Sequence, residues 1–444
     1  MSIQPDISPS DLSQTDTSTL TRLPRPTGHG TLQTLREQAM TRFAQTGLPR
    51  ADEEEWRFTN TDPIAEVGWT LPAGEYDIKE LFEQYSLRNT CAAEVVFING
   101  VYSTEWSSVG HLSRGLFAGL LADGPVAALA KLGTAATIDK TPFVALNSGF
   151  LDQVTLVHAA HGALIDRPVH VLHLSTTRGI PLLFSPRTLV IAQDGATLSV
   201  VETHAGSAAD ALLSNAVTEV FVSRDAVLDH YHCNGLSEAS WSITNTVSTL
   251  AAGATYTHHS VSYGARLVRN DLEVILDGPH ADATLNGLVL ARGKRQIDNH
   301  TLIRHEKPDC TSHELYKNVV ADSAFGVFKG RIFVQKDAQH TDARQTNRTL
   351  LLSDKASMES MPALEIYADD VKCSHGSTTG PLDEDMLFYL RSRGLSSEAA
   401  RDLLVYAFAA DMTQRMKVLP IRKRLESRLA AEQDLPQDLS IEAS

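Results

Sequence analysis

Hydrophobic and polar positions divide the chain into a helical start, a long strand-rich middle and a helical end. Near the start, Leu32, Leu35, Ala39 and Phe43 recur at three- and four-residue steps, which predicts an amphipathic helix. From about residue 165 the pattern alternates, with turns every few residues, as in P-V-H-V-L-H-L and T-E-V-F-V-S. After His375 helical periodicity returns, most clearly in E-A-A-R-D-L-L-V-Y-A-F-A-A-D-M.

A small-residue corner followed by a strand recurs in the middle of the chain. It reads G-A-T-L at Gly195, D-A-V-L at Asp225, G-A-T-Y at Gly253 and D-A-T-L at Asp282, with spacings of 30, 28 and 29 residues. D-S-A-F at Asp322 follows later than this period, which indicates an insertion in one turn. One such turn cannot bury its own apolar face, whereas stacked turns can. The repeat predicts a β-solenoid, a parallel β-helix; a large β-sandwich or jelly roll is the alternative.

These patterns predict four segments. The Ser- and Thr-rich composition of residues 1–29 predicts a disordered tail, which ends in the turn-rich R-P-R-P-T-G-H-G. An N-terminal helical region is expected over residues 30–94, the parallel β-helix over 95–365 and a C-terminal helical domain over 366–444. The helices after Asp383 suit either a solenoid cap or a docking surface.

Composition narrows the class of protein. A net charge of -15 argues against nucleic-acid or anionic-membrane partners, and no apolar run is long enough to span a bilayer. The four cysteines are far apart and form no C-x-x-C pair, which indicates free thiols in a reducing compartment, the cytoplasm. The start of the chain is not typical of a signal or transit peptide.

Motifs of nucleotide binding and hydrolysis are missing from the sequence. G-L-V-L-A-R-G-K-R, from Gly287, departs from a P-loop in its glycine spacing and lacks the required Ser or Thr. Neither G-x-S-x-G nor H-E-x-x-H occurs. We therefore expect this chain to bind no nucleotide.

The stretch V-K-C-S-H-G-S-T-T-G places Cys373 and His375 two positions apart. In an extended strand these side chains point to the same side, and both residue types are common metal ligands. Two ligands are half of a tetrahedral site, so another turn or another chain would have to supply the rest. A polar structural turn is the alternative.

Other polar residues cluster in the strand-rich region. C-T-S-H-E, from Cys310, is expected to be a polar loop, and the amide-rich segment 337–353 suits a ladder of stacked Asn and Gln side chains. Several histidines are expected to be half-exposed strand residues, because their i, i+2 pairs lack an obvious third ligand. They are His230, His232, His258, His259, His300, His305, His313 and His340.

Two long blocks carry a family resemblance. Y-A-D-D-V-K-C-S-H-G-S-T-T-G-P-L-D-E-D-M-L-F-Y-L-R-S-R-G-L, residues 367–395, resembles the C-terminal signature of SufD in the SufB/SufD family. The preceding family block resembles residues 325–353, and C-T-S-H-E-L-Y-K and E-E-W-R-F-T-N also fit. The resemblance covers about residues 30 to 430. C-S-H-G stands where SufB-like chains carry an E-H-E-A-T-T-type motif, which favours SufD over a SufB-like paralogue.

The resemblance implies a right-handed parallel β-helix flanked by helical regions. It also implies a non-catalytic scaffold of the SufBCD complex for iron–sulfur cluster assembly, pairing with SufB and docking the ATPase SufC through the C-terminal helices. A transient iron–sulfur cluster would be shared with SufB, with His375 as a ligand at the interface and Cys373 as a second candidate. In isolation the same surface could form a homodimer.

Two rival classes lead to different observations. A polysaccharide-active β-helix enzyme would need aromatic platforms and usually a secreted chain, but aromatic residues make up only 6% here. A stand-alone zinc protein would use the histidines, whereas a cluster site shared across an interface predicts little metal on the isolated chain.

Overall fold

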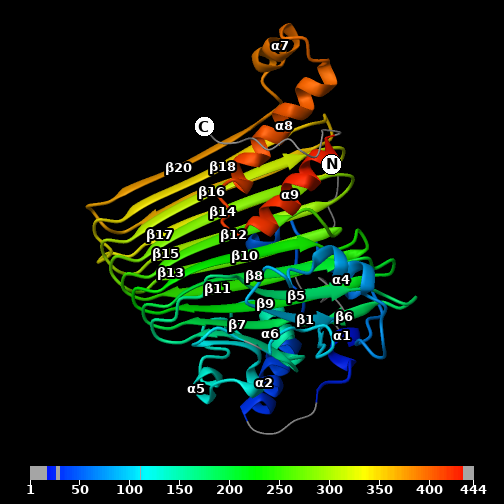
Figure 1. The fold of residues 1–444 in the computed structure, drawn as a ribbon, viewed down its shortest axis with the longest axis vertical. Helices are drawn as coiled ribbons and strands as arrows, with labels where there is room; N and C mark the ends of the chain where they lie inside the picture. Colours follow the sequence, from blue (N-terminus) through cyan, green and yellow to red (C-terminus); the bar gives the residue numbers. More distant parts are fainter. Residues whose placement is uncertain (1–17, 27–30, 111, 434–444) are drawn as a thin grey trace, which may run out of the picture.

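The body of the molecule is a parallel β-solenoid built from two facing ten-stranded sheets (Figure 1). The computed structural model describes residues 18–26, 31–110 and 112–433. Each turn contributes one strand to each sheet, and strands of successive turns pair in parallel, for example β10 with β12 and β11 with β13. This pairing confirms the predicted solenoid over a sandwich, because sandwich strands pair antiparallel.

The first sheet contains ten strands, which from β7 onward alternate in the chain with those of the second sheet. In spatial order they are β2 (Val101–Tyr102), β1 (Ala93–Ile98), β5 (Val169–Ser175), β8 (Thr197–Gly206), β10 (Val227–Gly235), β12 (Thr255–Ser262), β14 (Asp282–Ala291), β16 (Thr311–Val320), β18 (Asp342–Leu351) and β20 (Lys372–Gly380).

The second sheet faces the first and has a short extra strand, β6 (Leu182–Phe184), which pairs with β9. The other strands, in spatial order, are β19 (Ser357–Ile366), β17 (Phe325–Val334), β15 (Gln296–His305), β13 (Leu267–Leu276), β11 (Ser240–Leu250), β9 (Leu212–Val222), β7 (Arg187–Ala192), β4 (Val154–Ala159) and β3 (Leu116–Leu120).

One residue with left-handed backbone marks each corner before the strands of the first sheet. Its N–H donates to a carbonyl of the next turn, as Gly253 does to Pro279. The corner that the sequence placed at Asp282 is at His280, and Asp282 begins β14. Asp322 belongs to a second series of corners, which lead to the strands of the second sheet. Its late position in the repeat therefore does not indicate an insertion in the first series. The first series is Gly162, Gly195, Asp225, Gly253, His280, Asp309 and His340.

The solenoid interior combines an apolar half with a polar half. Stacked aliphatic residues such as Leu198, Leu228 and Leu276 form one continuous core. Elsewhere in the interior, amides bond from turn to turn: Nδ2 of Asn318 donates to Oδ1 of Asn347 at 2.7 Å. This contact reaches the amide-rich segment 337–353 diagonally, because the register sets Asn318 beside Thr349 and Asn347 beside Tyr316. An amide pair directly in register lies outside that segment, where Nδ2 of Asn270 donates to Oδ1 of Asn299 at 2.9 Å.

Most of the short helices and the two 3-10 turns at the start of the chain pack on the outer face of the second sheet. Helix α4 is the exception, because it packs on the first sheet against Val96, Leu172 and Ala205. Leu20 of the first helix is fully buried, so part of the predicted tail is ordered; residues 1–17 and 27–30 lie outside the described residues. The elements are α1 (Ser18–Arg22), α2 (Thr31–Thr46), η1 (Glu54–Trp56), α3 (Asp62–Ala65), α4 (Lys79–Tyr85), η2 (Leu121–Asp123), α5 (Val126–Leu129) and α6 (Pro142–Gly149).

Three helices follow the solenoid: α7 (Glu384–Ser392), α8 (Ser397–Thr413) and α9 (Leu419–Glu432). Asp383 caps α7 by accepting from the backbone N–H groups of Asp385 and Met386, and Ser396 caps α8. Helices α8 and α9 lie on the outer face of the first sheet, against Tyr231 and other apolar residues, while α7 projects from one end (Figure 1). Because β20 belongs to the sheet, the solenoid runs past residue 365 and the helices begin only at Glu384.

Candidate functional site: the edge strand at the open end of the solenoid

Cys373 and His375 lie on β20, the last strand of the first sheet (Figure 1). Within the part of the chain that the structure describes, β20 pairs on one side only, with β18. Cys373 stands beside Ala343, and His375 stands beside Gln345. The two candidate ligands therefore share one side of an edge strand, as their spacing predicted.

The two residues differ in their surroundings. Cys373 is half-buried against the apolar core, and this burial raises the pKa of its thiol. His375 is exposed. A metal ion binds the thiolate form of cysteine and the neutral form of imidazole. Because burial disfavours the thiolate of Cys373 and His375 is exposed, His375 is the better placed of the two ligands.

No third ligand joins this pair among the described residues, where the one group of three or more potential metal ligands lies elsewhere. Next to His375, Nε2 of Gln345 donates to Oε2 of Glu314 at 2.6 Å. Burial raises the pKa of Glu314 to about 7. The end of the solenoid thus presents two ligands at its rim and a buried carboxyl two strands further in.

The second Cys/His pair does not form a site. Cys310 is fully buried at a corner, where its thiol donates to the carbonyl of Gly278 at 3.2 Å, and His313 is exposed on β16. The segment expected to be a polar loop is therefore a corner followed by a strand. The two side chains point apart, so they cannot share a metal ion.

Most of the clustered histidines are buried, which corrects the expectation that they are half-exposed. His230, His232 and His258 point into the solenoid, because inward residues of parallel strands stack. His259 is buried on the outside, where its ring stacks on Tyr231 at 4.5 Å between centroids. Sequence reasoning recognised the histidines but not their direction, which depends on strand register.

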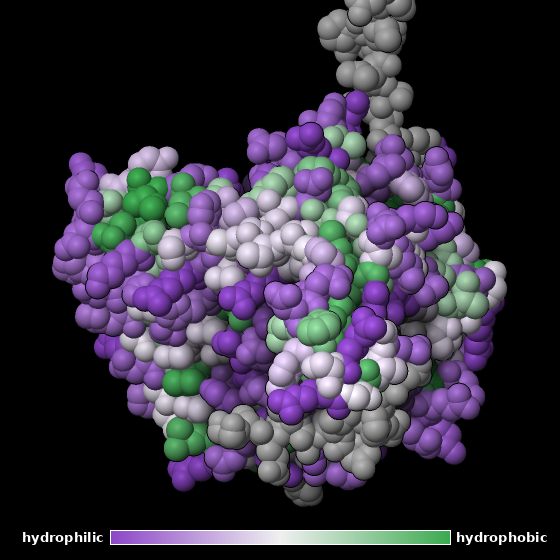
Figure 2. Space-filling model, turned by 90° about the horizontal axis from the view of Figure 1, so that it is seen from above, coloured by the Kyte–Doolittle hydropathy of each residue, from purple (hydrophilic) through white to green (hydrophobic). Residues whose placement is uncertain are grey.

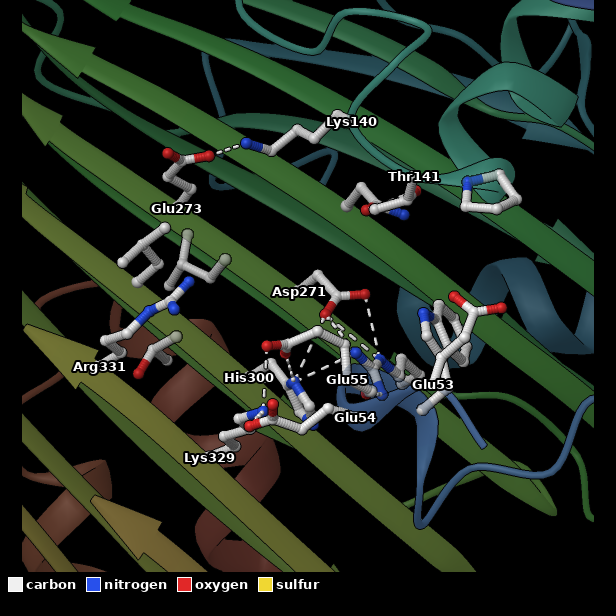
Figure 3. Close-up of a pocket in the computed structure, with 17 residues that line it drawn as sticks. Glu53, Glu54, Glu55, Lys140, Thr141, Asp271, Glu273, His300, Lys329 and Arg331 are labelled. Carbon is white, nitrogen blue, oxygen red and sulfur yellow. Dashed lines mark hydrogen bonds and ion pairs between the residues drawn. The ribbon is translucent and has the colours of Figure 1, made fainter. Parts of the chain in front are cut away.

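A hollow of about 440 Å³ lies on the outer face of the second sheet under η1 (Figure 3). There Nη2 of Arg269 is 2.9 Å from Oδ1 of Asp271, and Nε2 of His300 is 2.9 Å from Oδ1 of Asp298. Although burial acts against it, Asp298 and Glu55 raise the pKa of His300 to about 9. The charged side chains that line the pocket form an ion-pair network, which attaches the N-terminal region to the second sheet. We therefore assign these residues a structural role and no catalytic role.

Helix α7 carries an exposed apolar patch, defined here as Met386, Phe388 and Tyr389. These side chains are 54%, 72% and 56% exposed, on a helix with no buried residue. Seen from the end that carries β20 and α7, the surface shows hydrophobic areas among polar ones (Figure 2). Only residues 381–383 separate β20 from α7, so the candidate ligands and the α7 patch are close in the chain.

The fold and the site define a class: a parallel β-solenoid with helical terminal regions, whose last edge strand carries potential metal ligands. Comparison with known families identifies it further. The model described as "SUF system FeS cluster assembly, SufBD core domain" matches residues 173–408, and the model of the SufBD N-terminal region matches residues 25–171. The chain belongs to the SufBD family of iron–sulfur cluster assembly proteins.

Curated relatives agree with this family. The chain is 29% identical to an iron–sulfur cluster assembly SufBD family protein of Synechocystis, over 85% of this chain and 86% of that protein. It is 29% identical to the iron–sulfur cluster assembly protein SufD of Escherichia coli, over 88% of this chain and 91% of that protein. Identity to the chloroplastic protein ABCI7 of Arabidopsis thaliana is 28%, over 90% and 85%. No helix among the described residues is long and apolar enough to cross a membrane.

Proposed function

We propose that this chain is a non-catalytic scaffold subunit for iron–sulfur cluster assembly. It pairs with a SufB-type chain along β20, docks a SufC-type ATPase through its C-terminal helices, and presents His375 to a transient cluster at the SufB interface. Its four free thiols suit a reducing compartment, the cytoplasm. The relatives named SufD support this role over that of the SufB-like paralogue.

The observation that carries the proposal is the position of His375 on an edge strand. An edge strand presents unpaired backbone groups to another chain, and this one lies at the end of the solenoid from which α7 projects (Figure 1). A strand from the partner can extend the sheet and bring its own ligands beside the imidazole. Imidazole suits iron, and Cys373 would be the second ligand once the interface forms.

The apolar patch of α7 supports the docking of an ATPase. Exposed aromatic residues of this kind are typical of protein interfaces. Because α7 follows β20 after three residues, nucleotide-driven movement of a bound ATPase would act directly on the strand that carries His375. ATP would bind to that partner and not to this chain.

The test is to purify the chain with SufB and SufC and reconstitute the complex anaerobically with iron and sulfide. We expect His375→Ala to keep the complex intact and to lose most of the visible cluster absorption. His313→Ala, which also removes an exposed strand imidazole, is the matched control and should retain it. Equal cluster content in all three complexes would refute the role of His375 and leave the C-S-H-G segment as a structural turn.

A further inference from the structure

A second group of potential ligands lies inside the solenoid, away from β20. It consists of His173 on β5 and Glu202 and His204 on β8, all buried, with one ligand atom from each within 4.8 Å of the others. The rings of His173 and His204 stack at 4.6 Å between centroids, and Phe97 covers the other side of His173 at 5.0 Å. The register of β5 against β8 brings the two histidines together, because His173 stands directly beside His204 on the neighbouring parallel strand.

His173 is the residue that the packing leaves unexplained. It is 2% exposed, and among the described residues neither of its ring nitrogens has a hydrogen-bond partner. A buried polar atom without a hydrogen-bond partner destabilises the fold, so a histidine offers no advantage over an apolar ring here unless something binds it. Burial also lowers the pKa of His173 to about 4, which keeps the imidazole neutral.

Glu202 supplies the negative charge of the group and is held in place. Its carboxylate accepts from Oγ1 of Thr188 at 2.7 Å, from Oγ1 of Thr218 at 3.0 Å and from Nε2 of His230 at 2.8 Å. Oγ1 of Thr218 also lies 3.2 Å from the other carboxylate oxygen, and a metal ion would replace this longer contact. Carboxylates that bind metals are commonly held by such outer hydrogen bonds.

We propose that His173, Glu202 and His204 bind one divalent first-row transition-metal ion, Zn²⁺ or Fe²⁺. Two neutral imidazoles and one carboxylate form a ligand set that such ions take up, with further positions open to water. Ligand atoms around a tetrahedral ion lie about 3.3 Å apart, and the ion lies in the plane of each imidazole that binds it. The rings of His173 and His204 are stacked only 15° from parallel, so on binding they would turn out of the stack as the three side chains draw together. The site is enclosed, so the ion enters as the chain folds.

This site is separate from the proposed cluster site on β20, and it reverses the expectation that the isolated chain carries little metal. The isolated full chain, expressed with added zinc and iron, is purified and its metal content measured. We expect about one ion per chain in the wild type and less than about a tenth of that in His173→Phe and His204→Phe. Phenylalanine preserves the ring stacking in both variants.

Two controls distinguish the outcomes. His259→Phe removes another buried, stacked imidazole outside the group, and His375→Ala removes the β20 ligand; both should keep the ion. A chelator should lower the unfolding midpoint of the wild type and of His259→Phe, and leave His173→Phe unchanged. A wild-type chain without metal would overturn the proposal, as would metal retained in His173→Phe or lost in His375→Ala.

Discussion

The two candidate ligands on β20 show how position changes the chemistry of a residue. The same strand holds the Cys373 thiol partly within the apolar core and leaves the His375 imidazole at the surface. Burial raises the pKa of the thiol, whereas exposure allows a partner to approach the imidazole. Cys373 therefore needs a change in its surroundings before it can bind iron, and His375 does not.

Glu314 makes the stability of the fold depend on pH. Burial raises its pKa from 4.5 to about 7, so between these values the folded chain holds a proton that the unfolded chain releases. This contribution is complete below pH 4.5 and is lost as pH rises through 7. Glu314→Gln should remove the loss and stabilise the chain at pH 8 by up to about 3 kcal/mol, measured by urea unfolding at pH 5 and pH 8.

A suitable control for this prediction is Glu238→Gln, because the side chain of Glu238 is 75% exposed. The control should unfold like the wild type at both pH values. If Glu314→Gln were less stable than the wild type at pH 8, the carboxylate would be stabilising the interior, and the assigned direction would be wrong.

The sequence revealed part of the site. Its i, i+2 spacing predicted that Cys373 and His375 share a side, and the structure shows them on one edge strand. It did not reveal the group of His173, Glu202 and His204, although V-H-V-L-H-L was recognised as a strand. These residues meet only through the register of β5 against β8, which no local pattern specifies.

At the scale of elements, the corners of the solenoid explain both the success and the errors of the repeat analysis. Gly195, Asp225 and Gly253 share a small-residue pattern, so their period predicted the fold. His280 and His340 adopt the same left-handed backbone without that pattern, because the corner requires a backbone shape and a hydrogen bond to the next turn. The repeat is therefore regular in geometry and only partly visible in residue type.

Gly253→Ala tests this role of the corner. Its φ of +68° is unfavourable for alanine, and an added Cβ would overlap with Oδ1 of Asp225. The left-handed conformation alone costs roughly 1–2 kcal/mol in unfolding free energy. Gly162→Ala has a similar φ of +63° but nothing within 4 Å of the added carbon, so chemical denaturation should show a smaller loss there. Equal losses would mean that Asp225 moves aside freely.

At the scale of the whole molecule, the helical regions cover different outer faces. The N-terminal elements other than α4 pack on the second sheet, whereas α8 and α9 pack on the first. The two sheets and the helical ends follow from the hydrophobic pattern, but the choice of face does not, because it depends on tertiary contacts such as those of Trp241 and Tyr231. The α7 patch remains largely exposed, with Arg393 of the chain itself lying over the ring of Tyr389.

Phe388→Glu tests whether this patch docks SufC. The side chain is 72% exposed, so a charge there should leave the unfolding midpoint unchanged while weakening SufC binding at least tenfold, as measured by calorimetry. Pairing with SufB should persist. Leu164→Glu, at a position 69% exposed in the solenoid, should leave both interactions intact. Undiminished SufC binding by Phe388→Glu would exclude α7 from the docking surface.

The short connection between β20 and α7 has a mechanical consequence. Helices α8 and α9 are fastened to several turns at once, through Tyr231, Val261, Leu288 and Val319, so a force on them is spread over a stiff body. A force on α7 passes through residues 381–383 to a single strand that one neighbour holds. We therefore expect the strand with His375 to move more readily than the strands under α8 and α9 when α7 is pulled.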